Sequence, residues 1–247
     1  MKNKGTEAEQ EFTVENVMEA TAAAGTEQRR VSQTLIKELS PSELEDAKKL
    51  PSLDLDDLEQ VNYLQTIAEG WAYPLKRFMN EQELIESLNM NTVTDEDGKK
   101  HILSVPITQY VTEKQKADLE GASRIAIKCS QLKGHEDDIL AIIEKPEFFD
   151  NRKEEICTKT FGTGSLKHQK VERIYKQGDF LVSGESMQFT KKITFNDNLD
   201  QYRLTPQEIF DECEKRGADA VYAFQVRNPL HNGHCLLLKD TREQLIK

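Results

Sequence analysis

The spacing of hydrophobic residues predicts helices in the first part of the chain. One apolar face recurs at helical spacing through Leu58, Val61, Leu64 and Ile67. Gly70 can end this helix, because glycine readily adopts the left-handed conformation that follows many helices. Two more helices are predicted to begin at 40–43 and 80–83, where a serine or an asparagine precedes a glutamate by three positions and can cap the helix.

Further along, the pattern changes to short runs rich in isoleucine and valine. The segment "TDEDGKK" at 94–100 predicts a hairpin turn. Strands are predicted at 101–111, 123–130, 137–144, 179–185 and 191–197. A helix is predicted to start at Pro146, and "FGTGS" at 161–165 is expected to be a plain loop. Short strands at this spacing favour a small barrel or a mixed sheet over residues 30–195.

The last part of the chain predicts a strand between two helices. Thr205 as cap, Pro206 and Glu208 indicate the start of a helix that Gly217 can end. The segment "DAVYAFQV" at 219–226 is almost continuously apolar, which is typical of a strand buried on both faces of a parallel sheet. The polar turn "RNPLHNGH" then leads into a helix predicted at 235–247. A strand, a turn and a helix in this order form the first half of a doubly wound nucleotide-binding unit.

Composition limits the classes of partner. The chain has 247 residues, a net charge of −11 and a mean hydropathy of −0.67, and this acidity argues against a general nucleic-acid binder. No apolar run has the length of a membrane span, and the first residues lack the features of a secretion signal. The 4 cysteines form no C-x-x-C pair and indicate reduced thiols. We therefore expect a cytoplasmic protein with no membrane partner and no nucleic-acid partner.

The turn between the predicted strand and the last helix gathers residues that suit an anion. Such a turn lies at the sheet edge where open α/β sheets bind ligands, and the unpaired N–H groups of the helix point to the same place. Arg227 supplies a cation that can bind two oxygens of an oxyanion. His231 and His234 are three residues apart, so on a helix both rings lie on one face. The other polar or small residues of the turn are Gln225, Asn228 and Gly233. No nucleophile is arranged for covalent catalysis, and the residues suggest stabilisation of charge on a transferring phosphorus centre.

These residues resemble a known family. The sequence "QVRNPLHNGH" at 225–234 matches the Q-x-R-N-P-x-H-x-x-H signature of ATP sulfurylases (sulfate adenylyltransferases), which are H-x-G-H nucleotidyltransferases. Other blocks of that family are resembled by "EGWAYPLKRFM" at 69–79, "EFFDNRKEEICTKTFGT" at 147–163, "NDNLDQYRLTP" at 196–206 and "GADAVYAFQVRNP" at 217–229. The resemblance covers about residues 35–247 and is greatest to the sulfurylase half of the bifunctional animal-type enzyme that makes activated sulfate.

The resemblance implies both a fold and a reaction. The fold would be α+β, with a flexible polar tail at 1–34, a PUA-like β-barrel domain at 35–200, and the first strand and helix of a Rossmann-like α/β catalytic domain at 201–247. In the reaction, sulfate would attack the α-phosphorus of ATP, giving adenylyl sulfate and pyrophosphate, with Mg²⁺ on the ATP phosphates. ATP and sulfate are the expected small-molecule substrates, and the chain is expected to form a homo-oligomer.

The resemblance also implies roles for single residues. Gln225 and Arg227 would hold sulfate, and Val226 would contribute to catalysis mainly through its backbone. His231 and His234 would stabilise negative charge on the ATP phosphates in the transition state. The full set expected to bind ATP is Gln225, Arg227, Asn228, His231 and His234. No protein side chain is expected to bind a metal ion directly.

The chain departs from the family pattern in several places. Tyr73 stands where threonine is usual, Arg77 where glycine is usual, and Cys235 where alanine is usual. The later family motifs "GRDPAG", "YAGPxE" and "SGTxMR" are absent from the sequence, as is the P-loop of an adenylyl-sulfate kinase. We therefore expect an N-terminal part of an ATP sulfurylase that is inactive alone. The alternative is a non-catalytic PUA-like module that binds partners or mixes into oligomers of the full enzyme.

Several other residues have a structural explanation beside a functional one. His101, His135 and His168 are scattered and are expected at the surface or at strand ends. Trp71 fits core packing better than a platform for a ligand. Cys235 could be a redox-sensitive thiol, but a small buried residue is favoured.

Overall fold

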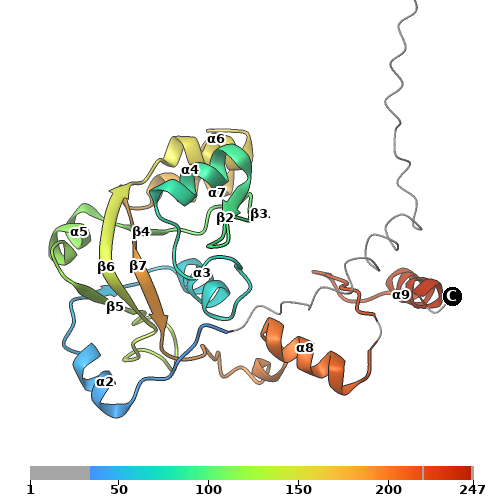
Figure 1. Ribbon diagram of the computed structural model, residues 1–247. Helices are drawn as coiled ribbons and strands as arrows, with labels where there is room; N and C mark the ends of the chain where they lie inside the picture. Colours follow the sequence, from blue (N-terminus) through green and yellow to red (C-terminus); the bar gives the residue numbers. More distant parts are fainter. Residues whose placement is uncertain (1–33, 219, 246–247) are drawn as a thin grey trace, which may run out of the picture. The chain divides into compact units, whose positions relative to one another are not determined.

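The computed structural model describes residues 34–218 and 220–245. Almost all of the tail expected at 1–34 lies outside these residues. The described part is built around one mixed sheet of 5 strands in the order β1-β5-β6-β7-β4 (Figure 1). The strands are β1 Ser52–Asp54, β4 Gln109–Val111, β5 Arg124–Lys128, β6 Ala141–Asp150 and β7 Phe180–Phe189. β1 and β5 are parallel, and the other neighbours are antiparallel. The edge strands β1 and β4 do not pair with each other, so the expected barrel is an open, curled sheet.

The two long strands form the centre of the sheet. β6 and β7 pair along their whole length, from Ala141 opposite Phe189 to Asp150 opposite Phe180. Ala126, Ile142 and Val182 are fully buried on this sheet. Gly178, just before β7, lies against the edge strand β4, where a Cβ atom would lie 2.1 Å from the carbonyl oxygen of Val111. This close approach holds the start of β7 against the end of β4.

The helices predicted in the first part of the chain are confirmed. They are α2 Pro41–Ala47 and α4 Glu81–Met90, predicted from capping signals, and α3 Leu58–Ala68, predicted from the spacing of apolar residues. Ser40 and Asn80 each accept a bond from the third backbone N–H of the helix, and a glutamate closes each capping box. The predicted turn at 94–100 is also confirmed, since it joins β2 Thr92–Thr94 to β3 Lys100–Ile102 in an antiparallel hairpin.

The core is continuous from the sheet to α3. Its fully buried members include Leu53, Leu64, Ile67, Phe78 and Ile125. A second cluster joins α4 to α6 Lys153–Phe161 and α7 Gln169–Lys176 through Leu84, Leu88, Ile156 and Leu181, with Ile174 packed against it. These three helices lie together beyond one end of β6 (Figure 1). Neither α7 nor the short helix α5 Glu113–Leu119 was expected from the hydrophobic pattern.

Two predictions for the middle of the chain are wrong. The helix expected from Pro146 begins only at Lys153, because residues 146–150 continue β6 and pair with β7. The strand expected at 191–197 is irregular, because the carboxylate of Asp200 accepts the backbone N–H groups of Phe195 (3.0 Å) and Asn196 (2.8 Å) in place of a neighbouring strand.

The last part of the chain contains two helices and no strand among its described residues. A short 3-10 helix, η1 Asp200–Tyr202, precedes α8 Pro206–Lys215, whose predicted capping box at Thr205 and Glu208 is confirmed. The strand expected at 219–226 is wrong, since residues 220–226 are irregular and mostly exposed. A strand of this kind needs hydrogen-bonded neighbours on both sides, and none of the described strands pairs with it. α9 Asn232–Leu245 begins three residues before the predicted start.

Two side chains are placed differently from expectation. His135 is 4% exposed rather than at the surface, and its ring nitrogens lie 2.7 Å from Asp138 and 2.8 Å from the carbonyl of Thr194. It therefore joins the loop before β6 to the segment after β7. Trp71 is 52% exposed rather than part of the core, and its indole N–H donates to Glu69 at 3.3 Å.

Candidate functional site

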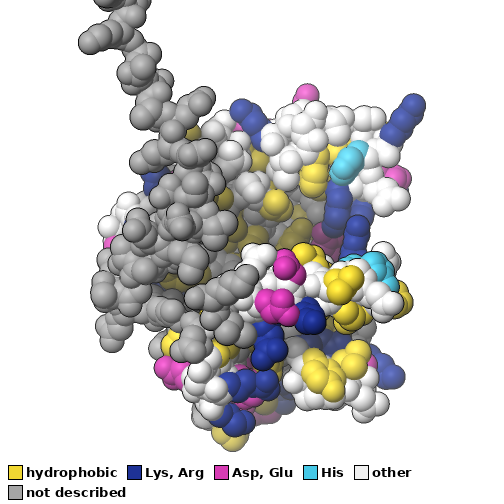
Figure 2. All heavy atoms as spheres, turned by 90° about the vertical axis from the view of Figure 1, so that its right-hand side faces the viewer, with side chains coloured by type: hydrophobic (Ala, Val, Ile, Leu, Met, Phe, Trp, Pro, Cys, Tyr) yellow, Lys and Arg dark blue, Asp and Glu magenta, His cyan; other side chains and the backbone are white. Residues whose placement is uncertain are grey.

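The loop at 225–234 lies open to solvent. Gln225, Arg227 and Asn228 are exposed, and Val226 is 39% exposed. Apolar residues on either side are exposed as well, including Val221 at 66% and Leu236 at 67%. Figure 2 shows hydrophobic side chains at the surface beside Lys and Arg side chains on the side toward α9.

The two histidines of the loop form one unit. The rings of His231 and His234 are stacked, with centroids 3.8 Å apart and planes inclined by 30°. Phe224 packs edge-on against His234 with a centroid distance of 5.6 Å. The helical spacing that predicted a shared face therefore corresponds to direct ring contact.

Hydrogen bonds at the start of α9 fix the tautomer of both rings. The N–H of Gly233 donates to Nδ1 of His231 at 3.2 Å, and the N–H of His231 donates to Nδ1 of His234 at 3.3 Å. Because each Nδ1 is an acceptor, each neutral ring carries its proton on Nε2. The Nε2–H groups make no hydrogen bond within the described residues and can donate to a ligand oxygen.

Gly233 makes this arrangement possible. A Cβ atom at this position would lie 3.1 Å from Cε1 and 3.2 Å from Nδ1 of His231, closer than ordinary side-chain contacts. A larger residue would push the His231 ring away from the position in which it caps the helix.

The other predicted site residues are near in sequence but make no common network. Within the described residues, no hydrogen bond or ion pair involves the side chains of Gln225, Arg227 or Asn228, and none joins them to the histidines. Cys235 is exposed, so its expected role as a small buried residue is wrong. The loop thus offers two imidazole donors, a guanidinium and two amides to an anion, without holding them in one fixed geometry.

No metal-binding cluster accompanies the loop in the part of the chain that the structure describes. No group of three or more His, Cys, Asp and Glu side chains there could hold a metal ion. None of the described helices is long and apolar enough to cross a membrane.

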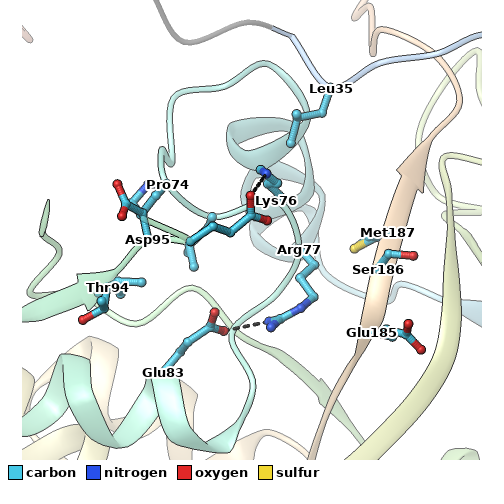
Figure 3. Close-up of a pocket in the computed structure, with 13 residues that line it drawn as sticks. Leu35, Pro74, Lys76, Arg77, Glu83, Thr94, Asp95, Glu185, Ser186 and Met187 are labelled. Carbon is cyan, nitrogen blue, oxygen red and sulfur yellow. Dashed lines mark hydrogen bonds and ion pairs between the residues drawn. The ribbon is translucent and has the colours of Figure 1, made fainter. Parts of the chain in front are cut away.

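A hollow separate from the loop at 225–234 lies between the loop after α3, the β2–β3 hairpin and β7 (Figure 3). Its volume is about 370 Å³, and both of its basic side chains are paired with glutamates of the same hollow. Arg77 donates to Glu83 at 2.7 Å and to the carbonyl of Phe78 at 3.0 Å, while Lys76 donates to Glu96 at 2.7 Å. Arg77, which stands where the family has glycine, therefore supports the capping box of α4 and leaves no free charge for a ligand.

Comparisons with known proteins agree with this architecture. A family model described as a PUA-like domain matches residues 24–191, and a model described as ATP-sulfurylase matches residues 200–246. Two relatives from Arabidopsis thaliana are similar in sequence. ATP sulfurylase 2 is 36% identical over 203 residues, covering 82% of this chain and 41% of the relative. ATP sulfurylase 4, chloroplastic, is 38% identical over 192 residues, covering 77% and 39%.

One solved structure shares the fold. A hexameric APS kinase from Thiobacillus denitrificans superposes with a TM-score of 0.61 at 22% identity, over 87% of this chain and 38% of that chain. At this level of identity the match concerns the fold alone.

The curled sheet and the family match together define the class: the chain belongs to the family of PUA-like domains. Its second match and its relatives make it similar in sequence to ATP sulfurylases. The chain spans about two fifths of the length of these curated relatives.

Proposed function

We propose that this chain provides the PUA-like portion and one phosphate-binding loop of a sulfate adenylyltransferase. In the proposed reaction, a sulfate oxygen forms a bond to the α-phosphorus of ATP, and the bond from that phosphorus to the pyrophosphate oxygen breaks. The observation that carries the proposal is the stacked pair of His231 and His234, which lies inside the ATP-sulfurylase match. The PUA-like region would serve as the scaffold from which the loop continues.

Different residues of the loop would bind ATP and sulfate. The Nε2–H groups of His231 and His234 would donate to ATP phosphate oxygens and offset the charge that builds up there. Arg227 would bind two oxygens of sulfate, with Gln225 as a neutral donor. Asn228 would contact ATP, and Val226 would contribute through its backbone N–H and C=O.

Mg²⁺ would enter this site on the ATP phosphates. The ion would supply positive charge on the phosphates, while the side chains of the loop would orient them.

The loop by itself is a poor catalyst for this reaction. Adenylyl transfer depends on donors that are already fixed in place, and here Arg227 and the two amides are exposed and unsupported. We therefore propose that the chain binds substrates weakly and does not turn them over alone.

Imidazole NMR tests the binding part of the proposal. The chain has 5 histidines, so ¹⁵N-labelled ring signals can be assigned individually. Millimolar Mg-ATP should shift the His231 and His234 signals and leave the buried His135 unchanged as an internal control. Arg227→Ala should weaken the response to sulfate, whereas Arg216→Ala, which removes an exposed arginine from the end of α8, should not. Unmoved His231 and His234 signals would exclude the loop as the nucleotide site of this chain.

A pyrophosphate-release assay tests the catalytic part. With ATP, Mg²⁺ and sulfate or molybdate, the chain should release pyrophosphate at the background rate. Sustained release that disappears in Arg227→Ala would support the reaction class but contradict the proposal that the chain is inactive alone.

The exposed apolar residues around the loop favour a second role. Val221, Leu230 and Leu236 are each more than half exposed, and a group of exposed apolar residues is typical of a surface that binds another protein. A non-catalytic chain could cover them by joining an oligomer of a complete ATP sulfurylase. Co-expression of the two proteins should then yield a mixed oligomer on analytical ultracentrifugation, and Leu236→Glu should abolish it.

A further inference from the structure

The exposed Trp71 lines an open cleft to which the loop at 225–234 contributes no residue. The cleft has a volume of about 600 Å³ and lies between the end of α3 and the segment after β7. The lining residues that matter here are Gln65, Glu69, Trp71, Phe195, Tyr202 and Arg203. Tyr202 is 75% exposed, so two aromatic side chains are available to a ligand.

A buried carboxylate lines the same cleft. Glu69 is only 4% exposed, and its two oxygens accept from Nε2 of Gln65 at 2.8 Å and from Nε1 of Trp71 at 3.3 Å. Both donors are neutral, and no cation pairs with Glu69 in the part of the chain that the structure describes. A carboxylate has about four acceptor positions, so roughly half of them are unused. Burying such a charge without a positive partner is unfavourable.

Arg203, which lines the cleft, is paired with carboxylates other than Glu69. Arg203 binds Asp197 through both ends of its guanidinium, at 2.8 Å and 2.6 Å, and binds Asp200 at 2.8 Å. Its guanidinium also lies over the ring of Phe195, 4.8 Å from the centroid. Arg203, the basic residue among the described residues that line the cleft, is therefore more than offset by these two carboxylates and does not pair with Glu69.

We propose that this cleft binds an organic cation, namely an alkylammonium or guanidinium group. The charged head would pair with Glu69 beside the rings of Trp71 and Tyr202, because aromatic faces attract cations that are partly removed from water. The alkyl stem would pack against the same two rings. This site is separate from the proposed sulfate adenylyltransferase chemistry and does not depend on it. The cation could be a free small molecule or a Lys or Arg side chain of a second copy of this chain.

Intrinsic fluorescence reports on this site alone, because Trp71 is the 1 tryptophan of the chain. The protein is titrated with argininamide and with n-butylammonium at constant ionic strength, and n-butanol serves as the neutral match. We expect a saturable change in Trp71 fluorescence with both cations in the millimolar range and none with n-butanol. Equal responses to the cations and to n-butanol would overturn the proposal.

Variants distinguish the contribution of the Glu69 charge to binding from that of the aromatic side chains. Glu69→Gln keeps a side chain of the same shape and should raise the Kd for argininamide at least tenfold. Glu113→Gln makes the same change of charge at an exposed site on α5 and should leave the Kd unchanged. If Glu69→Gln does not fold, Tyr202→Ala tests the site instead. Tyr202 is exposed, and the loss of its ring should weaken the binding of argininamide several-fold. An unchanged Kd in the folded variant would contradict the site.

Sedimentation equilibrium distinguishes the two sources of the cation. Self-association that argininamide disrupts, and that Glu69→Gln weakens, would identify a side chain of a second copy as the occupant. A chain that remains monomeric while it binds argininamide would identify a free small molecule.

Discussion

Single residues set the tightest limits on this fold. Gly178 lies where any Cβ atom would collide with the backbone of Val111 and come within 2.7 Å of the N of Thr112. The side chain of Ser183 in β7 donates to the carbonyl of Phe78 at 2.6 Å, so the same strand is also tied to the loop after α3. Neither constraint is visible in the sequence, because each depends on a segment more than sixty residues away.

Replacing Gly178 should destabilise the protein strongly. Gly178→Ala forces β4 and β7 apart, and we expect the free energy of unfolding to fall by about 3 kcal/mol or more. Urea denaturation followed by circular dichroism measures the loss. Gly164→Ala is the matched control, since its Cβ atom would meet nothing closer than 4.0 Å and should change stability by less than about 0.5 kcal/mol. Equal effects of the two variants would show that the close approach at Gly178 does not exist in solution.

The pair of Asp197 and Arg203 should make stability depend on acid pH. The hydrogen-bonded guanidinium of Arg203 lowers the pKa of Asp197 to about 2 from the ordinary 3.8. Because the folded state favours the charged carboxylate, the pair stabilises the fold fully above about pH 4, and this contribution is lost as the pH falls toward 2.

Asp197→Asn should therefore lower the thermal midpoint at pH 7, and the difference from the natural chain should shrink between pH 4 and pH 2.5. Circular dichroism melts at several pH values provide the measurement. Asp118→Asn, at an exposed carboxylate on α5, should show no such convergence. A constant difference across the whole range would mean that Asp197 carries no bond to Arg203 when folded.

At the scale of elements, signals within a few residues of each other predict helix starts, whereas the pairing of distant segments is not predictable from the sequence. The starts of α2, α4 and α8 are encoded within four residues by their capping boxes, so sequence alone predicts them. Residues 146–150 have a composition that also suits a helix, and only their pairing with 180–184 makes them a strand. In the same way, residues 220–226 look like a buried strand, but without partner strands they have nothing to pair with.

The cap of α4 should contribute measurably to stability. Oδ1 of Asn80 accepts the N–H of Glu83 at 2.8 Å, and the Glu83 carboxylate returns a bond to the N–H of Asn80 at 2.9 Å. Asn80→Ala should cost about 1 kcal/mol in chemical denaturation. Gln82→Ala, at an exposed position of the same helix, is the control and should be nearly neutral. A neutral Asn80→Ala would indicate that water replaces the cap without loss.

At the scale of the whole molecule, the core and the candidate site differ in how well they are held. The sheet and α3 share one buried core, whereas the segment from 220 to 234 has exposed side chains and an irregular backbone before α9. The sequence predicted a polar turn before the last helix, and helical spacing predicted that His231 and His234 share one face of that helix. It could not predict the burial of Glu69, because that depends on how the end of α3 packs against the segment after β7.

Hydrogen exchange should reveal this difference directly. The amides at 221–224 make no backbone hydrogen bonds within the described residues and should exchange within seconds at neutral pH. The amides of β6 that bond to β5 and β7 should exchange orders of magnitude more slowly. Mass spectrometry of peptic fragments resolves the two regions. Slow exchange at 221–224 would mean that the segment pairs as a strand after all.

The pairing of β6 with β7 has a consequence for how the chain tolerates change. The residues between the two strands, which form α6, α7 and the glycine-containing connection, leave the sheet and return to it. This connection therefore begins and ends at residues that pair with each other, Asp150 and Phe180. A longer or shorter connection between α6 and α7 changes only residues far from the paired ends of β6 and β7. Its length can therefore vary without changing the register of the two central strands.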